Sequence, residues 1–205
     1  PDSGASTVVS RAHVALVARG GATLEAAKAE IAACAPAARI VAISADVSTA
    51  AGCRHAFETA ESALDRIDVV VNNAGISDAV IRAEDQDPAQ FRNVVDINLN
   101  ATFVLSAAVA KFVIASGGTC SMVNIASIHG LVAGAPNAQA AYVASKAGVV
   151  GLTRELAGQW ARNGINVNAI APGYFHTELT DVMFASEDGG LRYIRRNTML
   201  GRPGE

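Results

Sequence analysis

The feature that most constrains this chain is an alternation of short apolar runs with longer helical patterns. Helical periodicity spans residues 23–34, 50–65, 88–115 and 140–162. Almost continuously apolar runs, which predict strands, cover residues 13–18, 39–44, 67–72, 119–126 and 165–170. Runs of this kind are typical of parallel strands covered by helices on both faces. The alternation therefore predicts an α/β fold, a doubly wound parallel sheet in a three-layer α/β/α arrangement with right-handed crossovers.

The third helical stretch carries start and stop signals of its own. Asp87 can cap its amino end, and Pro88 fits the first helical position. Gly117 and Gly118 provide its end. We see no internal repeat and no linker, so residues 1–205 are expected to form a single domain.

Composition narrows the class of protein. Hydrophobic residues make up 51% and charged residues 17% of the 205 residues, which suits a compact fold. The net charge of −3 gives no reason to expect nucleic acid or an anionic membrane as a partner. We see neither an apolar run of membrane-spanning length nor a secretory leader, and the three cysteines are scattered. A soluble, cytoplasmic protein with reduced cysteines is the expectation.

Polar and glycine residues follow the predicted strands. Ligands bind beyond the carboxyl ends of the strands in open α/β sheets, so such residues predict a binding site there. One group follows each predicted strand in turn: Arg19; Asp46 and Val47; the segment 72–75 (NNAG); Ser127; Pro172 and Gly173.

Tyr142 and Lys146 lie four residues apart within a predicted helix and can therefore share one face. A nearby ammonium group favours phenolate and lowers the pKa of a tyrosine, which makes it a usable general acid or base. Ser127 could bind a substrate carbonyl or hydroxyl group. Asn98 lies within a long helix, where asparagine is disfavoured. A hydrogen bond to water or to backbone would explain its presence.

Five motifs in order resemble the short-chain dehydrogenase/reductase family. They are NNAG (72–75), INLNATF (97–103), NIASIHG (124–130), YVASKAGVVGLTRELA (142–157) and INVNAIAPGYFHT (165–177). The resemblance covers roughly residues 13–204. Within this family the sequence is similar to bacterial sugar-acid dehydrogenases and 3-oxoacyl-carrier reductases. The resemblance implies a Rossmann-like fold.

The family resemblance implies hydride transfer between NADP or NAD and a small-molecule carbonyl or secondary alcohol. Tyr142 would be the acid/base, Lys146 would also hold the nicotinamide ribose, Ser127 would orient the substrate oxygen, and Asn98 would hold a relay water. The remaining cofactor-binding residues implied are Gly4 in the phosphate turn; Asp46, Val47, Asn73, Ala74 and Gly75 on the adenosine side; and Pro172, Gly173, Phe175 and Thr177 around the nicotinamide. A homodimer or homotetramer would form through the helices at 88–115 and 140–162.

Arg19 bears on the choice of cofactor. Folds of this kind that prefer NAD place an acidic residue after the second strand, where it binds the ribose hydroxyls. The corresponding residue here is Arg19, which suits the 2′-phosphate of NADP. The alternative is an ordinary solvated arginine at a strand end.

Both ends of the chain depart from the family pattern. The usual first strand has no counterpart, and Val8 and Ser10 stand where the second and third glycines of the phosphate-binding turn belong. The usual last strand is also missing. A catalytically silent or incomplete relative that binds no cofactor is therefore the alternative hypothesis.

Other kinds of site fit the sequence less well. His129 follows Ser127 by two residues, but Ile125 and His129 occupy the glycine positions that a hydrolase nucleophile elbow requires. The histidines lack metal-ligand spacing, so no metal site is expected. The polar segment 187–196 could be either a mobile substrate lid or a solvated pair of helices.

Overall fold

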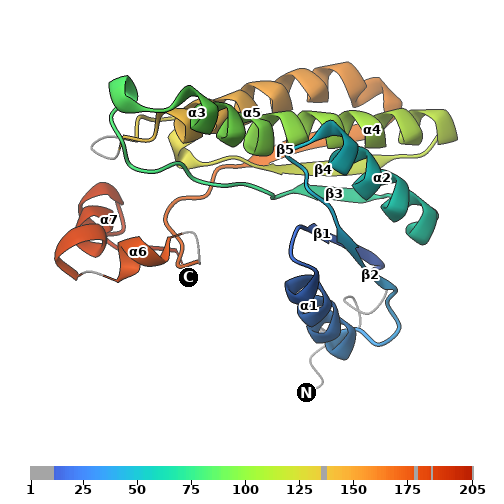
Figure 1. The fold of residues 1–205 in the computed structure, drawn as a ribbon. Coiled ribbons are helices and arrows are strands. Elements are labelled where there is room, and N and C mark those ends of the chain that lie inside the picture. Colours follow the sequence, from blue (N-terminus) through green and yellow to red (C-terminus); the bar gives the residue numbers. More distant parts are fainter. Residues whose placement is uncertain (1–11, 135–137, 178–179, 186, 205) are drawn as a thin grey trace.

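The computed structural model describes residues 12–134, 138–177, 180–185 and 187–204 (Figure 1). These residues include five strands, with ends within two residues of the predicted ones: β1 (Val14–Ala18), β2 (Ile40–Ser44), β3 (Val69–Asn72), β4 (Cys120–Ile125) and β5 (Ile165–Ile170). The helices are α1 (Gly21–Cys34), α2 (Ala50–Leu64), α3 (Pro88–Val95), α4 (Ala101–Ser116), α5 (Ala140–Trp160), α6 (Asp181–Phe184) and α7 (Arg192–Asn197). The predicted α/β class is confirmed.

All strand pairing among the described residues is parallel, but the strands form two sheets. Strands β1 and β2 pair with Val14 opposite Ile40, and the second sheet has the order β3-β4-β5. Figure 1 shows the two-stranded sheet below the three-stranded one, with α2 running from the level of β2 up beside α4. We predicted one sheet that lacks the usual first strand, and the strand pairing among the described residues gives two separate parallel sheets.

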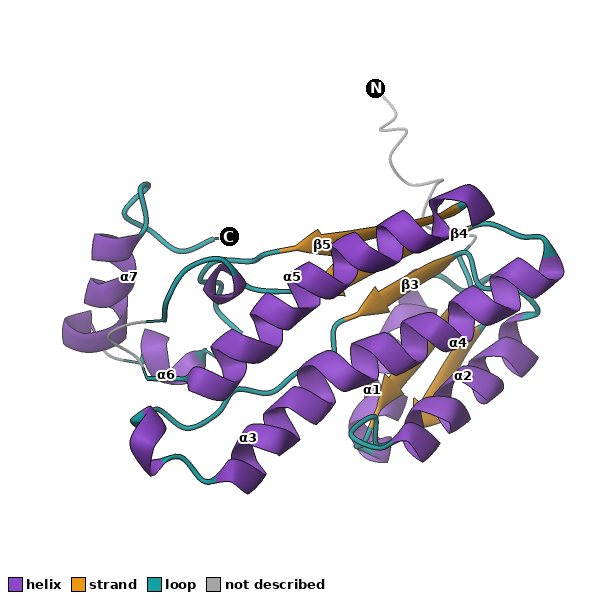
Figure 2. Cartoon of the chain, turned by 90° about the horizontal axis from the view of Figure 1, so that it is seen from above, coloured by secondary structure: helices purple, strands orange, loops and turns teal. Residues whose placement is uncertain are grey.

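Helices α4 and α5 lie side by side over one face of the β3-β4-β5 sheet (Figures 1 and 2). The largest core cluster forms between them, where Met122 and Ile165 are almost fully buried. Along β3, Val70 packs against this cluster. Val69 and Val71 point the other way, as alternate residues of a strand must, and are 61% and 58% exposed.

Among the described residues the helices that pack on this sheet, α4 and α5, cover one face, and the predicted α/β arrangement of parallel strands and helices is confirmed for the fold as a whole. Helix α1 packs on β1 and β2 instead, below the larger sheet. A nearly continuous apolar run does not by itself show how many of its faces are covered.

The exposed face of β3 leads to a prediction about stability. Val69→Thr and Val71→Thr are expected to change the free energy of unfolding by less than about 0.5 kcal/mol, because surface substitutions remove little buried area. Val70→Thr, the matched control on the packed face, should cost about 1–3 kcal/mol. Urea unfolding of the three variants measures this. A loss above about 1 kcal/mol at Val69 or Val71 would show that something covers this face.

Residues Pro88–Ser116 form one helical run that includes a π-helical segment, Asp96–Asn100. The predicted signals are confirmed: the Asp87 carboxylate accepts from the Ala89 amide, Pro88 is the first helical residue, and Gly117 ends the helix at a φ of 66°.

The same run corrects our expectation that no stretch is long and apolar enough to cross a membrane. Its 29 residues have a mean hydropathy of 1.6 over the most apolar window, so it meets that requirement by length and composition. It also packs on α2 and α5, and 44% of that window is buried. Packing therefore accounts for part of its apolar character.

The carboxy-terminal segment leaves β5 and forms short helical pieces to one side of the sheets (Figure 1). Within it Ile194 of α7 is fully buried, and Phe175 pairs in parallel with Gly204 through a single bridge. The segment 187–196 is largely helical. The alternative interpretation, a mobile substrate lid, remains a prediction.

Candidate functional site

The carboxyl ends of β3 and β4 are joined by a buried polar network. The side-chain amide of Asn72 donates to Ser106 Oγ at 2.9 Å and to Asn124 Oδ1 at 2.8 Å. Asn124 in turn donates to Thr153 Oγ1 on α5 at 2.9 Å. These four side chains are at most 9% exposed and fully paired, so they fix the strand ends relative to α4 and α5. We did not predict this network, although an asparagine ending each of two apolar runs was the available signal.

Ser127 lies just beyond β4 and is buried. Its Oγ accepts from the His129 amide at 3.2 Å and thereby caps the 3₁₀ turn 128–130. A hydroxyl that accepts one bond keeps its hydrogen for another partner. Both interpretations of Ser127, a cap and a group able to bind a substrate oxygen, are therefore compatible with its geometry.

Tyr142 and Lys146 lie side by side near the start of α5, as predicted. The Lys146 ammonium nitrogen is 5.7 Å from the centre of the Tyr142 ring. It donates to the carbonyl of Ile125, the last residue of β4, at 2.7 Å. Lys146 is only 5% exposed, and burial lowers its pKa to about 8. The lysine thus connects the helix that carries the tyrosine to the strand that precedes Ser127.

The Asn98 side chain bonds to backbone groups. Backbone and water were the two kinds of partner expected for it. Its side chain accepts from the Ile76 amide at 2.8 Å and donates to the Ile76 carbonyl at 2.9 Å. It also donates to Ser145 Oγ on α5 at 3.0 Å. Asn98 is 1% exposed, so the contacts hold the loop after β3 against α5. That it holds a relay water remains a prediction.

Two glycines permit close packing around Lys146. A Cβ on Gly75 would lie 3.3 Å from Asn98 Oδ1 and 3.5 Å from Lys146 Nζ. A Cβ on Gly130 would lie 2.7 Å from the Lys146 carbonyl oxygen, closer than real Cβ atoms approach. The turn after β4 can therefore approach the Lys146 backbone only because Gly130 lacks a side chain, and a side chain at Gly75 would crowd Asn98.

Arg19 and Asp46 meet at the carboxyl end of the two-stranded sheet. Ser44 Oγ donates to the Arg19 carbonyl at 3.1 Å, which ties the ends of β1 and β2 together. A bond from the Ser48 amide lowers the pKa of Asp46, and the charge of Arg19 adds to this. A hollow beside β1 and α1 includes Arg19 and Gly20 in its wall.

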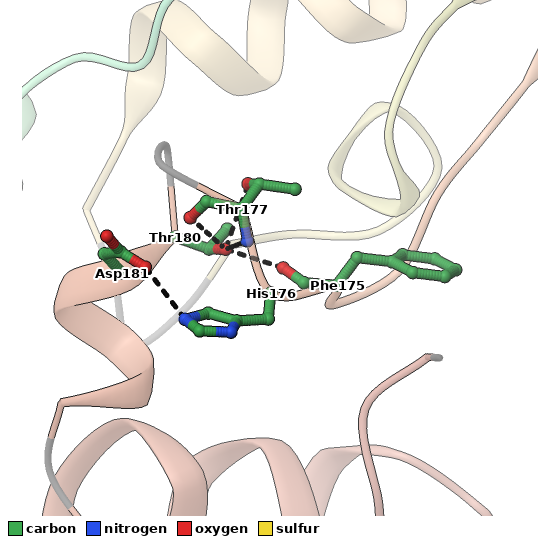
Figure 3. Close-up of polar contacts among 5 residues, drawn as sticks. All are labelled: Phe175, His176, Thr177, Thr180 and Asp181. Atoms are coloured by element: carbon green, nitrogen blue, oxygen red, sulfur yellow. Dashed lines mark hydrogen bonds and ion pairs between the residues drawn. The ribbon is translucent and has the colours of Figure 1, made fainter. Parts of the chain in front are cut away.

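The segment after β5 carries the residues expected around the nicotinamide. The Pro172 carbonyl accepts from the Ile128 amide at 3.0 Å, which joins this segment to the turn after Ser127. Gly173 has open space where a side chain would stand, and Phe175 is 43% exposed. The Thr180 hydroxyl accepts a hydrogen bond from the Thr177 amide. It also lies within hydrogen-bond distance of the Thr177 and Phe175 carbonyl oxygens, so it holds this turn together (Figure 3).

The structure places Asn98, Ser127, Tyr142 and Lys146 at the carboxyl ends of β3 and β4 and the start of α5, and Gly75 lies beside Asn98 and Lys146. Asn73 and Ala74 follow β3 directly, at the same end of the larger sheet, and are exposed. Arg19, Asp46 and Val47 belong to the smaller sheet. Gly4 lies outside the described residues, so the structure does not describe the predicted phosphate turn.

Burial of Lys146 predicts a pH-dependent contribution to stability. Between about pH 8 and its ordinary value of 10.5, the folded chain has released this proton while the unfolded chain retains it, so the free energy of unfolding rises with pH. The difference between wild type and Lys146→Met should thus rise by up to about 3 kcal/mol across that interval. Urea unfolding of both proteins at several pH values measures it, and a flat difference would contradict the desolvation of Lys146.

Comparisons with known proteins identify the family. The sequence model described as short chain dehydrogenase matches residues 5–188. The chain belongs to the short-chain dehydrogenase family. Over 163 residues it is 36% identical to 2-dehydro-3-deoxy-D-gluconate 5-dehydrogenase of Escherichia coli, with 77% of this chain and 61% of that enzyme aligned. Over 210 residues it is 34% identical to 2-dehydro-3-deoxy-L-rhamnonate dehydrogenase (NAD(+)) of a Sphingomonas species, covering 98% and 80%.

A solved structure agrees with the family assignment. Gluconate 5-dehydrogenase from Burkholderia cenocepacia, in complex with NADP and tartrate, superposes with a TM-score of 0.81 at 28% identity, covering 94% of this chain and 73% of that one. The alignment to the Escherichia coli enzyme thus spans about three fifths of that relative's length.

Proposed function

We propose that this short-chain dehydrogenase interconverts a carbonyl group and a secondary alcohol with a nicotinamide cofactor, NADP in preference to NAD. The observation that carries the proposal is the convergence of Ser127, Tyr142 and the buried Lys146 at the carboxyl end of β4. The named relatives act on sugar acids, so keto sugar acids and their alcohols are the proposed substrate class. We further propose a cytoplasmic, single-domain protein that assembles as a dimer or tetramer.

The residues present fit a nicotinamide nucleotide on this side of the sheet. Gly75 leaves room beside Asn98 and Lys146, and Gly173 borders open space. Asn73, Ala74 and Gly75 would line the adenosine side, Asp46 and Val47 would meet the adenine, and Pro172, Phe175 and Thr177 would border the nicotinamide. The bound nucleotide would supply the hydride for carbonyl reduction.

The remaining chemistry belongs to the side chains. Ser127 donates its free hydroxyl hydrogen to the substrate oxygen and so holds the carbonyl in place. Tyr142 gives its phenolic proton to the same substrate oxygen while the carbonyl carbon gains its hydrogen. In alcohol oxidation the proton returns from the substrate oxygen to Tyr142. The Lys146 ammonium group stabilises the phenolate left on Tyr142. Asn98 keeps the loop after β3 against α5, and we propose that it holds the water that restores the proton.

A substrate screen tests the proposal. Oxidation of NADPH would be followed with a panel of keto sugar acids, ketoses and a 3-oxoacyl thioester, with Tyr142→Phe as the blank. Turnover of at least one member, abolished in the variant, is the expected result. Absence of turnover for every member by a folded chain that binds NADPH would contradict the proposed reaction.

Arg19 gives a prediction about cofactor preference. Arg19→Gln is expected to weaken NADPH binding about 10- to 100-fold and to leave NADH binding within about threefold, because a charged hydrogen bond to the 2′-phosphate is lost. Nucleotide fluorescence titration measures both dissociation constants, and Arg154→Gln, an exposed change on α5, is the control. Equal weakening of NADPH and NADH binding would show that Arg19 does not bind the 2′-phosphate.

The division into two sheets favours a second candidate function. Arg19 and Asp46 lie on the smaller sheet and the catalytic residues on the larger one, so the two halves of a cofactor site are not joined by strand pairing. A catalytically silent relative would have this architecture. The titration separates the two candidates, because a silent relative binds neither nucleotide.

A further inference from the structure

We infer that His129 is a positioning residue for the proposed reaction, because it contacts both hydroxyl-bearing side chains of the site. Its backbone amide donates to Ser127 Oγ at 3.2 Å. Its imidazole lies edge-on to the Tyr142 ring, with ring centres 6.3 Å apart and planes at 89°. One residue thus influences where both hydroxyl groups lie, and both must reach the same substrate oxygen. This inference rests on the proposed function.

The imidazole is itself held from the opposite side. His129 Nε2 and Tyr174 Oη are 3.2 Å apart, and their rings also meet edge to face at 6.0 Å. Tyr174 donates in turn to Tyr193 Oη on α7 at 3.5 Å. A Tyr174 hydrogen donated to Tyr193 leaves the Tyr174 oxygen to accept from His129, and this arrangement requires the ring proton of His129 on Nε2.

Burial supports a fixed, uncharged ring. His129 is 8% exposed and Tyr174 is 9% exposed. Desolvation lowers the pKa of His129 and raises that of Tyr174, so both groups stay neutral at physiological pH. A neutral imidazole held at both ends acts as a rigid wall beside Tyr142 and adds no competing charge. It also links the catalytic tyrosine, by way of Tyr174, to α7.

Three variants separate the contacts that His129 makes. His129→Gln keeps an amide donor for Tyr174 and removes the ring next to Tyr142. His129→Phe keeps a ring and removes the donor, and Tyr174→Phe removes the acceptor from the other side. The measurements are kcat and KM for the carbonyl substrate, the dissociation constant of NADPH, and the carbon NMR resonance of the Tyr142 ring. The chain has 3 tyrosines, so ring-labelled tyrosine gives a spectrum that single substitutions assign.

The expected result is a kcat effect without a binding effect. His129→Gln should lower kcat about tenfold and shift the Tyr142 resonance, while KM and NADPH binding stay within about twofold. His129→Phe and Tyr174→Phe should each lower kcat about threefold, and their combination should do no more than either alone, because both remove the same bond.

Other outcomes overturn the inference. A purely structural role would lower the unfolding midpoint and leave kcat per folded molecule unchanged. An unchanged Tyr142 resonance in His129→Gln would show that the ring does not position Tyr142. The resonance requires no turnover, so it decides the positioning claim even if wild type proves inactive and the proposed function fails. Tyr174→Phe is conservative enough to fold if the His129 variants do not.

Discussion

Tyr142→Phe is expected to lower kcat by about 10²- to 10⁴-fold, because it removes the proton donor and leaves every apolar contact of the ring. The position of Tyr142 supports a large effect. It lies beside the buried ammonium group of Lys146, which in turn is bonded to the end of β4. The hydroxyl takes no part in the packing of α5, so the unfolding midpoint should stay within a few degrees of that of wild type. Steady-state kinetics and thermal unfolding measure the two quantities.

Tyr193→Phe is the matched control for this variant. It also removes one phenol hydroxyl, but from α7 and not from the helix that carries Lys146. Its kcat should remain within a few fold of wild type. If Tyr142→Phe kept more than about a tenth of the activity, another group would have to supply the proton, and the assignment of Tyr142 would be wrong.

Gly130→Ala is expected to destabilise the fold by about 1–3 kcal/mol and to lower activity at the same time. The added Cβ would lie 2.7 Å from the Lys146 carbonyl oxygen and 2.8 Å from its carbonyl carbon. These are backbone atoms of α5, so they cannot rotate away as a side chain would. Either the turn after Ser127 or the helix must shift, and both carry groups of the proposed site. Urea unfolding and kcat measure the two effects.

Gly151→Ala provides the control on the same helix. Nothing lies within 4 Å of a Cβ at Gly151, which is exposed. Alanine there should stabilise α5 by about 0.5–1 kcal/mol, because glycine loses more conformational entropy in a helix. Equal behaviour of the two variants would mean that the contact between the 128–130 turn and α5 is looser than the structure shows.

Much of the local structure could be predicted from the sequence. The strand ends, the Asp87 cap, Pro88 and the Gly117 stop follow from short-range patterns that act over a few residues. The proximity of Tyr142 and Lys146 follows from helix geometry alone. Such features depend on neighbouring residues, so tertiary context did not alter them.

Features that depend on distant partners could not be predicted in the same way. The separation into two sheets and the exposed face at Val69 and Val71 depend on which elements are available to cover a strand. The bonds of Asn98 to Ile76 and Ser145 connect three parts of the chain, whereas the helical pattern around Asn98 predicts only some contact with water or backbone. His129 was considered only as a hydrolase signal, because its contacts with Tyr142 and Tyr174 arise from three separate elements.

The most direct test of the central claim is isotope transfer from the cofactor to the substrate. The chain would be incubated with a keto sugar acid and NADPH deuterated at the transferable position, and the alcohol product analysed by mass spectrometry. The account predicts one deuterium on the new carbinol carbon, and no labelled product with Tyr142→Phe. Unlabelled ketone recovered from a folded chain at saturating nucleotide would contradict it and would favour the catalytically silent relative.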